Sequence, residues 1–227
     1  TCWAAARRAD GGSMRRRLVK LTLATLVAFA GLVALGTWQV QRLHWKEGLI
    51  AVRAAALAAP PVDLPTTLAA ARALEFRRVR ASGTFLYDHE FPVNTTERES
   101  GRAGYLVVTP LRRADGTVLM VERGWVPPEL RDARARAAGN PAGIVDVEGL
   151  LRLPSVGKPG WFVPDNDPQR NQWFYVDLAA MGRAAQVPTV LPFYLEAGPA
   201  PNPGGYPLGG QAHTELPNDH LQYAITW

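Results

Sequence analysis

Residues 21–38 read LTLATLVAFAGLVALGTW, a run of 18 residues without a charged side chain. A helix of this length spans about 27 Å, close to the roughly 30 Å thickness of the hydrocarbon core of a bilayer. Leu18 and Val19 extend the run past Lys20, whose ammonium group can reach the headgroups. The sequence therefore predicts a transmembrane helix over residues 18–38.

The net charge of the chain lies ahead of this helix. The chain has 25 Lys and Arg, 20 Asp and Glu, and a formal charge of +5. Residues 1–20 carry all of this net charge, so the rest of the chain is neutral in total. A neutral body argues against a surface that follows nucleic-acid phosphates, and no nucleic-acid partner is expected. The positive-inside rule instead places residues 1–17 in the cytoplasm and the main domain outside it.

A cleavable signal peptide is the alternative interpretation, with residues 15–20 as its basic region and Ala34-Leu35-Gly36 as its cleavage site. The residues that follow favour an uncleaved anchor, because Trp38, Trp45 and other apolar residues recur at helical spacing. We expect the helix to continue over residues 39–59 along the membrane surface, with both tryptophans at headgroup depth.

The two ends of the chain carry further expectations. A single cysteine, Cys2, excludes a disulfide framework and a zinc or iron–sulfur site built on thiolates. Met14 directly precedes the basic cluster, so a natural start there is expected, and Cys2 then has no functional weight. Residues 217–227 are expected to begin a second, truncated transmembrane helix. A natural C-terminus packed on the domain is the alternative for this short apolar end.

Residues 60–216 are expected to form an extracytoplasmic α+β domain with an antiparallel, barrel-like sheet and a few short helices. Pro60-Pro61 should end the first helix, and Thr66 or Thr67 should cap a short helix through Leu74. Asp115-Gly116 predicts a tight hairpin. The predicted strands cover residues 76–85, 90–96, 105–111, 118–126, 144–153, 173–176 and 190–195. Helices are predicted over 129–138 and 177–186, and a loop over 198–210.

A search for catalytic motifs finds little. The four histidines are His44, His89, His213 and His220, and none forms a closely spaced ligand pair. The chain has no phosphate-binding glycine loop, nucleophile elbow or haem-attachment motif. The carboxylate pairs Asp165/Asp167 and Glu97/Glu99 could serve a glycosidase, although their neighbours favour turns. The chain is therefore interpreted as a binding or assembly protein and not an enzyme, with a tethered cell-envelope hydrolase as the rival.

His220 is a candidate on its own grounds. It would lie at the interfacial mouth of the second helix, and an ionisable side chain at membrane depth is a functional-site hypothesis by default. Neutral imidazole binds haem iron, whereas the alternative is an interfacial histidine that is hydrogen-bonded to water.

Five stretches, taken in order from residue 35 to residue 227, resemble the surfeit locus family of cytochrome c oxidase assembly factors. The most diagnostic is the last, Asn218-Asp219-His220-Leu221-Gln222-Tyr223-Ala224-Ile225-Thr226-Trp227. The other four lie within residues 35–46, 104–111, 121–127 and 162–168. The resemblance implies two transmembrane helices that flank a domain outside the cytoplasm, in the inner membrane of a bacterium.

The resemblance also implies a function in the respiratory chain. Members of the family assist maturation of the haem-copper oxidase, and the resemblance implies that this chain binds haem a and helps deliver it to subunit I. Expected partners are therefore cytochrome c oxidase subunit I, haem A synthase and membrane lipid. A structural partner of the oxidase that binds no haem is a further alternative.

The family's favoured haem contact maps onto His220, which would bind the haem iron. A haem also needs aromatic walls and cations for its propionates. The residues expected to supply these are Trp38, Arg42, Trp45, Lys46, Tyr223 and Trp227. Gly124, by contrast, is interpreted as structural, in a strand where a larger residue would not fit.

Overall fold

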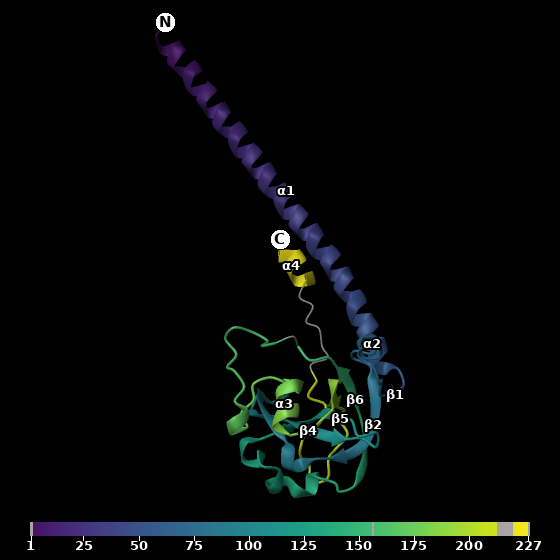
Figure 1. Cartoon of the computed structure of the whole chain (residues 1–227). Helices are drawn as coiled ribbons and strands as arrows, with labels where there is room; N and C mark the ends of the chain where they lie inside the picture. Colours follow the sequence, from purple (N-terminus) through teal and green to yellow (C-terminus); the bar gives the residue numbers. More distant parts are fainter. Residues whose placement is uncertain (1, 156, 213–219, 227) are drawn as a thin grey trace. The chain divides into compact units, whose positions relative to one another are not determined.

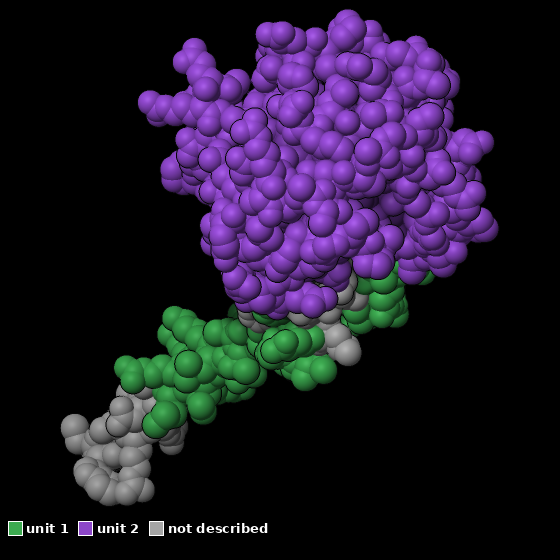
Figure 2. All heavy atoms as spheres, turned by 90° about the horizontal axis from the view of Figure 1, so that it is seen from below, with its two compact units in different colours: residues 1–52, 215–227 green, residues 53–214 purple. Residues whose placement is uncertain are grey.

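A computed structural model of the chain describes residues 2–155, 157–212 and 220–226, with side chains described from residue 14 onward except at residues 220, 221 and 224. The chain forms two compact units, residues 1–52 with 215–227 and residues 53–214 (Figure 2). Helix α1 (Cys2–Ala58) is continuous and contains a segment long and apolar enough to cross a membrane. It ends just before Pro60, as predicted, because proline lacks the N–H that a further helical turn needs. The bilayer boundaries at residues 18 and 38 stay predictions.

The second unit is built on a seven-stranded sheet (Figure 1). Its strand order is β1-β2-β6-β7-β5-β4-β3. A further pairing of β2 with β4, through Thr84 opposite Arg112 and Phe85 opposite Leu111, closes five of the strands into a barrel. The predicted α+β class with a barrel-like sheet is therefore confirmed. The strands are β1 (Val62–Asp63), β2 (Arg78–Phe85), β3 (Phe91–Thr96), β4 (Ala103–Arg112), β5 (Val118–Val126), β6 (Ile144–Arg152) and β7 (Val190–Ala197).

The sheet is mixed and not antiparallel throughout, because β5 runs parallel to β7 and β1 runs parallel to β2. A parallel pair needs a long crossover connection, and residues 127–189 supply one between β5 and β7. Strand β7 thereby lies between β5 and β6, antiparallel to the latter. The sequence shows the strands but not this insertion, because the order of strands in a sheet depends on contacts distant in sequence.

Strand β5 is buried along its whole length, including its charged residues Glu122 and Arg123. Successive side chains of a strand point to opposite faces. Leu119 and Val121 accordingly belong to one core cluster with Phe193, whereas Met120 belongs to a second cluster with Trp173. The second cluster also contains residues of α3 (Leu178–Ala184), which covers that face of the sheet.

The helix caps follow the sequence closely. Thr67 accepts a hydrogen bond from the N–H of Ala70 at the start of α2 (Leu68–Ala73). Asp177 accepts one from Ala180 at the start of α3. Both caps satisfy N–H groups that have no partner inside the helix. The predicted hairpin at Asp115-Gly116 is also confirmed, since it joins the antiparallel strands β4 and β5.

Two predicted elements differ in the structure. The helix predicted over 129–138 is two short 3₁₀ segments, η2 (Pro128–Leu130) and η3 (Ala133–Gly139), the second with non-helical dihedrals at Arg136. The side chain of Arg136 is directed into a buried ionic cluster there. The strand predicted over 173–176 is absent from the described part; its Trp173 instead makes one isolated bridge to Val93 and packs edge-on against Phe91. The remaining 3₁₀ segments are η1 (Tyr87–His89) and η4 (Pro168–Arg170).

Candidate functional site

Four of the residues predicted to hold a haem lie along one face of α1. Trp38, Arg42, Trp45 and Lys46 follow one another at spacings of four, three and one residues, which places them within an arc of about 100° around the helix. The guanidinium carbon of Arg42 lies 3.9 Å from the centre of the Trp45 ring. A cation at this distance is attracted by the negative face of the indole ring. The helical spacing of residues 42 and 45 therefore places the Arg42 guanidinium beside the Trp45 ring.

The two indole rings on this face are available to a ligand in this structure. About half of the surface of Trp38 and of Trp45 is exposed, and Lys46 is partly buried. His44 lies nearby on the same helix, and its Nδ1 is 3.3 Å from a carboxylate oxygen of Glu47. His44 is thus held in a local i, i+3 contact on the exposed helix surface.

The other predicted haem contacts fall at the end of the chain. His220 is the first residue of α4 (His220–Thr226), and its side chain is not among those described. Tyr223 lies on the same helix and is half-exposed. Trp227 and His213 lie outside the described residues. Among the described side chains of the predicted site, the structure brings Arg42 and Trp45 into contact.

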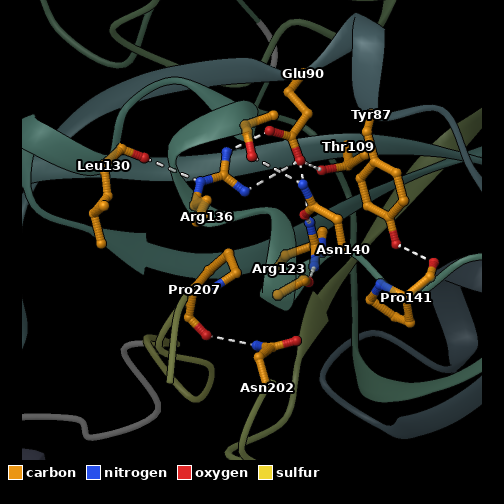
Figure 3. Close-up of polar contacts among 12 residues, drawn as sticks. Tyr87, Glu90, Thr109, Arg123, Leu130, Arg136, Asn140, Pro141, Asn202 and Pro207 are labelled. Carbon is orange, nitrogen blue, oxygen red and sulfur yellow. Dashed lines mark hydrogen bonds and ion pairs between the residues drawn. The ribbon is translucent and has the colours of Figure 1, made fainter. Parts of the chain in front are cut away.

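The second unit contains a buried ionic cluster that sequence reasoning missed (Figure 3). The carboxylate of Glu90 lies between the guanidinium groups of Arg123 and Arg136. Thr109 donates to the same carboxylate at 2.9 Å, and Asn140 accepts from Arg123 at 2.9 Å. These residues come from four segments that are up to 50 positions apart in the sequence, and no local motif links them. The cluster consequently fastens η3 to strands β4 and β5.

Charge is unequal within this cluster, since two guanidinium groups face one carboxylate. Both arginine side chains are 3% exposed, and burial lowers the pKa of Arg123 while Glu90 opposes the change. Neutral oxygens take the remaining N–H groups, with Gly139 accepting from Arg123 and Leu130 from Arg136. The rings of Phe85 and Tyr87 lie about 5 Å from the Arg123 guanidinium, at 4.9 and 5.0 Å. Such complete pairing is typical of a structural cluster.

A cavity of about 900 Å³ adjoins the ionic cluster. Its charged lining residues have both signs in equal number, with four arginines against four acidic side chains. They are Asp88, Glu90, Glu129, Arg131, Asp132, Arg134, Arg136 and Arg170. Several are already engaged: Glu90 pairs with Arg136, and Asp132 caps η3 by accepting from the N–H of Arg134. The cavity therefore offers no excess charge of one sign to a ligand.

A second group of buried charges lies on β5, β6 and β7. Burial raises the pKa of Glu122 to about 8; the neighbouring Glu196 adds to the rise, and Arg152 opposes it. Arg152 donates to both carboxylate oxygens of Glu196 at 2.8 and 2.9 Å. Burial and the same two carboxylates also raise the pKa of the Tyr194 hydroxyl. Two carboxylates beside one guanidinium favour a neutral Glu122.

The carboxylates considered for a hydrolase lie in turns. Asp165 pairs with Lys158 at 2.8 Å, and Asp167 caps η4 by accepting from the N–H groups of Gln169 and Arg170. Glu97 similarly accepts from the N–H of Ser100. This agrees with their interpretation as turn residues. In residues 2–155, 157–212 and 220–226, no three His, Cys, Asp or Glu side chains gather as a metal site would require.

Sequence comparisons identify relatives over most of the chain. The model of the SURF1 family matches residues 26–227. The chain is 42% identical over 204 residues to a SURF1-like protein of Monosiga brevicollis, covering 85% of the chain and 76% of that protein. It is 38% identical over 209 residues to surfeit locus protein 1 of Homo sapiens, covering 85% and 68%. A SURF1-like protein of Caenorhabditis briggsae is 32% identical over 223 residues, covering 89% and 68%.

Proposed function

Because the chain belongs to the SURF1 family, we propose that it is a membrane-anchored assembly factor for the haem-copper cytochrome c oxidase, with no catalytic turnover of its own. The apolar segment of α1 supports the anchor. The proposed location is a bacterial inner membrane, with residues 53–214 outside the cytoplasm. The basic residues ahead of the apolar run support this orientation through the positive-inside rule.

The proposed cargo is haem a, received from haem A synthase and passed to oxidase subunit I. A haem is a flat apolar ring with two carboxylates and an iron that accepts an axial ligand. The observation that carries this proposal is the contact of Arg42 with the exposed ring of Trp45 on an apolar helix. This face offers an aromatic wall beside a cation that can pair with a propionate.

Each residue has a separate role in this proposal. His220 supplies the axial imidazole to the iron, while Trp38, Trp45, Tyr223 and Trp227 supply apolar walls. Arg42 and Lys46 hold the propionates, which keeps the carboxylates at the water-facing edge of the membrane. Lys46 is partly buried on α1, so a propionate beside it would gain from reduced exposure to water.

The experiment is production of the full chain together with haem a, followed by absorption spectroscopy of the purified protein. We expect a histidine-ligated spectrum that His220→Ala abolishes or shifts. His89→Ala is the matched control, because His89 lies in η1 of the other unit and is exposed. If His220→Ala retains the spectrum and occupancy of the parent chain, His220 is not the ligand, and His44 is the next to test. If neither the parent chain nor any variant binds haem, the proposal of haem a as cargo is wrong.

A further inference from the structure

Residues 159–164 form a projecting turn, here called the aromatic turn. Its sequence is Pro159-Gly160-Trp161-Phe162-Val163-Pro164, and the N–H of Val163 donates to the carbonyl of Gly160 at 3.1 Å. This hydrogen bond closes a four-residue β-turn and places the two large aromatic residues at its central positions. The turn therefore presents Trp161 and Phe162 at its tip.

Both rings are exposed to an extent that is unusual for side chains of this size. Trp161 is 93% exposed and Phe162 is 75% exposed. The rings lie edge to face with their centres 6.1 Å apart, so they contact each other and not the domain core. Exposure of large apolar side chains to water is unfavourable, because their burial would stabilise the protein. Exposed apolar groups of this kind therefore mark interaction sites.

The aromatic turn is uncharged, and the two charged residues that flank it neutralise each other. Residues 159–164 contain no charged side chain, and the flanking Lys158 and Asp165 pair with each other at 2.8 Å. Asn166 then fixes the next residues, since its side-chain oxygen accepts from the N–H of Phe174 at 2.8 Å. The result is an ordered, uncharged pair of aromatic rings, which suits a lipid interface better than a charged protein surface.

The segment that leads to the aromatic turn leaves the barrel close to Arg53, a residue near the end of α1. Strand β6 ends at Arg152, and the guanidinium of Arg152 lies 4.7 Å from the centre of the Phe76 ring. The guanidinium of Arg53, at the base of α1, lies 4.1 Å from the same ring. The chain that leads to the aromatic turn thus begins near Arg53, since Arg152 and Arg53 lie against the same ring.

The length of the chain between Trp45 and Arg53 limits how far Arg53 can lie from a bilayer. If Trp45 lies at headgroup depth, Arg53 follows eight residues later, about 12 Å along the helix axis. Each limb of the aromatic turn can extend about 10 Å, and the headgroup layer adds roughly 5 Å on the bilayer side. These lengths together are enough to bring the rings to the lipid headgroups.

We propose that the aromatic turn inserts Trp161 and Phe162 into the headgroup region of the bilayer that anchors α1, and so gives the domain a membrane contact separate from its membrane helices. Indole and phenyl rings are suited to this depth because the boundary between headgroups and acyl chains accepts their apolar surface. This contact restricts motion of the domain relative to the bilayer further than membrane helices alone do. This inference does not depend on the proposed cargo.

The test uses the full chain, with the only cysteine removed by Cys2→Ser, in phosphatidylcholine and phosphatidylglycerol nanodiscs. Phe162→Cys provides a site for a nitroxide label. Ile144→Cys is the matched control, because Ile144 is 80% exposed and starts β6, at the opposite end of the strand from Arg152. Electron paramagnetic resonance then compares collisions of each label with dissolved oxygen and with an aqueous nickel chelate.

We expect the label at position 162 to collide with the nickel chelate severalfold less often than the label at position 144, and with oxygen more often. Trp161→Cys in the same background should give the same result, which covers the case in which Phe162→Cys fails to fold. Equal access of nickel to positions 162 and 144 would overturn the proposal. It would also be overturned if the label at position 162 stays in water in nanodiscs and is immobilised only when purified oxidase is added, since the occupant is then a protein.

Discussion

Gly124 packs against the main-chain carbonyl of Leu208, so closely that a Cβ atom at position 124 would overlap the carbonyl oxygen. Trp125, next in the chain, donates from its N–H to this oxygen at 2.8 Å and accepts from the N–H of Leu208 at 2.8 Å. Gly124 also has a backbone φ of +135°, which residues other than glycine rarely adopt. The loop over residues 198–210 is therefore fastened to β5 at a position that only glycine fits.

We expect Gly124→Ala to destabilise the second unit by more than about 3 kcal/mol, and Gly124→Glu to impair its folding, because the side chain collides with the main chain of the loop. The measurement is chemical unfolding of the full chain in detergent, followed by near-ultraviolet circular dichroism. Gly116→Ala is the control, since Gly116 also has a positive φ but has open space around it. Equal losses at the two positions would show that the contact with Leu208 is unimportant.

The Glu90 carboxylate predicts a second effect on stability. Glu90→Gln removes the negative charge between Arg123 and Arg136, leaving two buried guanidinium groups in mutual repulsion. We expect a loss of about 3–5 kcal/mol in the free energy of unfolding. Glu148→Gln is the matched control, because Glu148 pairs with Arg78 at the surface and should cost less than about 1 kcal/mol. A Glu90→Gln loss as small as that of the control would contradict the structural role of the cluster.

The raised pKa of Glu122 predicts that the free energy of unfolding depends on pH. Its pKa is raised to about 8 in the folded chain from an ordinary 4.5, so the folded state keeps a proton that the unfolded chain loses between these values. The free energy of unfolding should therefore fall as the pH rises through this window. Glu122→Gln should reduce this slope and stabilise the chain at pH values above the window.

Denaturant titrations at a series of pH values measure the effect of Glu122. Glu148→Gln again serves as the control, because the hydrogen bond and charge of Arg78 lower the pKa of Glu148 and place its titration below the window. The assignment to Glu122 is wrong if Glu122→Gln leaves the slope as it is in the parent chain.

Two substitutions of Arg42 distinguish the effect of its charge from the effect of its stacking on Trp45. Under the proposed function, Arg42→Ala should lower haem occupancy because a propionate loses its cation. Arg42→Lys should retain more haem, since it keeps the charge while losing the planar stacking on the ring. Haem extraction from equal amounts of purified protein provides the measurement. Equal occupancy in the parent chain and in Arg42→Ala would remove Arg42 from the site.

Orientation can be tested separately from haem binding. A reporter enzyme that is active only outside the cytoplasm, fused after Gly210, should be active, because the net positive charge precedes the apolar run. A fusion of the same reporter ahead of Met14 is the control and should be inactive. The reverse pattern would place the domain in the cytoplasm, and N-terminal sequencing that begins near Thr37 would show that the anchor is cleaved.

The sequence by itself determined the features that depend on neighbours along the chain. The uncharged run over residues 21–38 is long and apolar enough for a membrane helix. The proline that ends α1, the caps Thr67 and Asp177, and the turn at Asp115-Gly116 follow from local sterics and hydrogen bonding. The family resemblance read from ordered motifs is confirmed by the match over residues 26–227. The haem-contact residues, by contrast, stay predictions.

Only the tertiary structure decided which distant groups meet. The parallel pairing of β5 with β7 and the closure of β2 on β4 depend on where a long crossover connection returns. Arg136 lies within the predicted helix 129–138, but in the structure it is the buried partner of Glu90, 46 residues away. A buried charge needs a partner of opposite charge or a hydrogen-bonding group. Such a partner can lie far away in the sequence, so the cluster can be identified only when the positions of the strands are known.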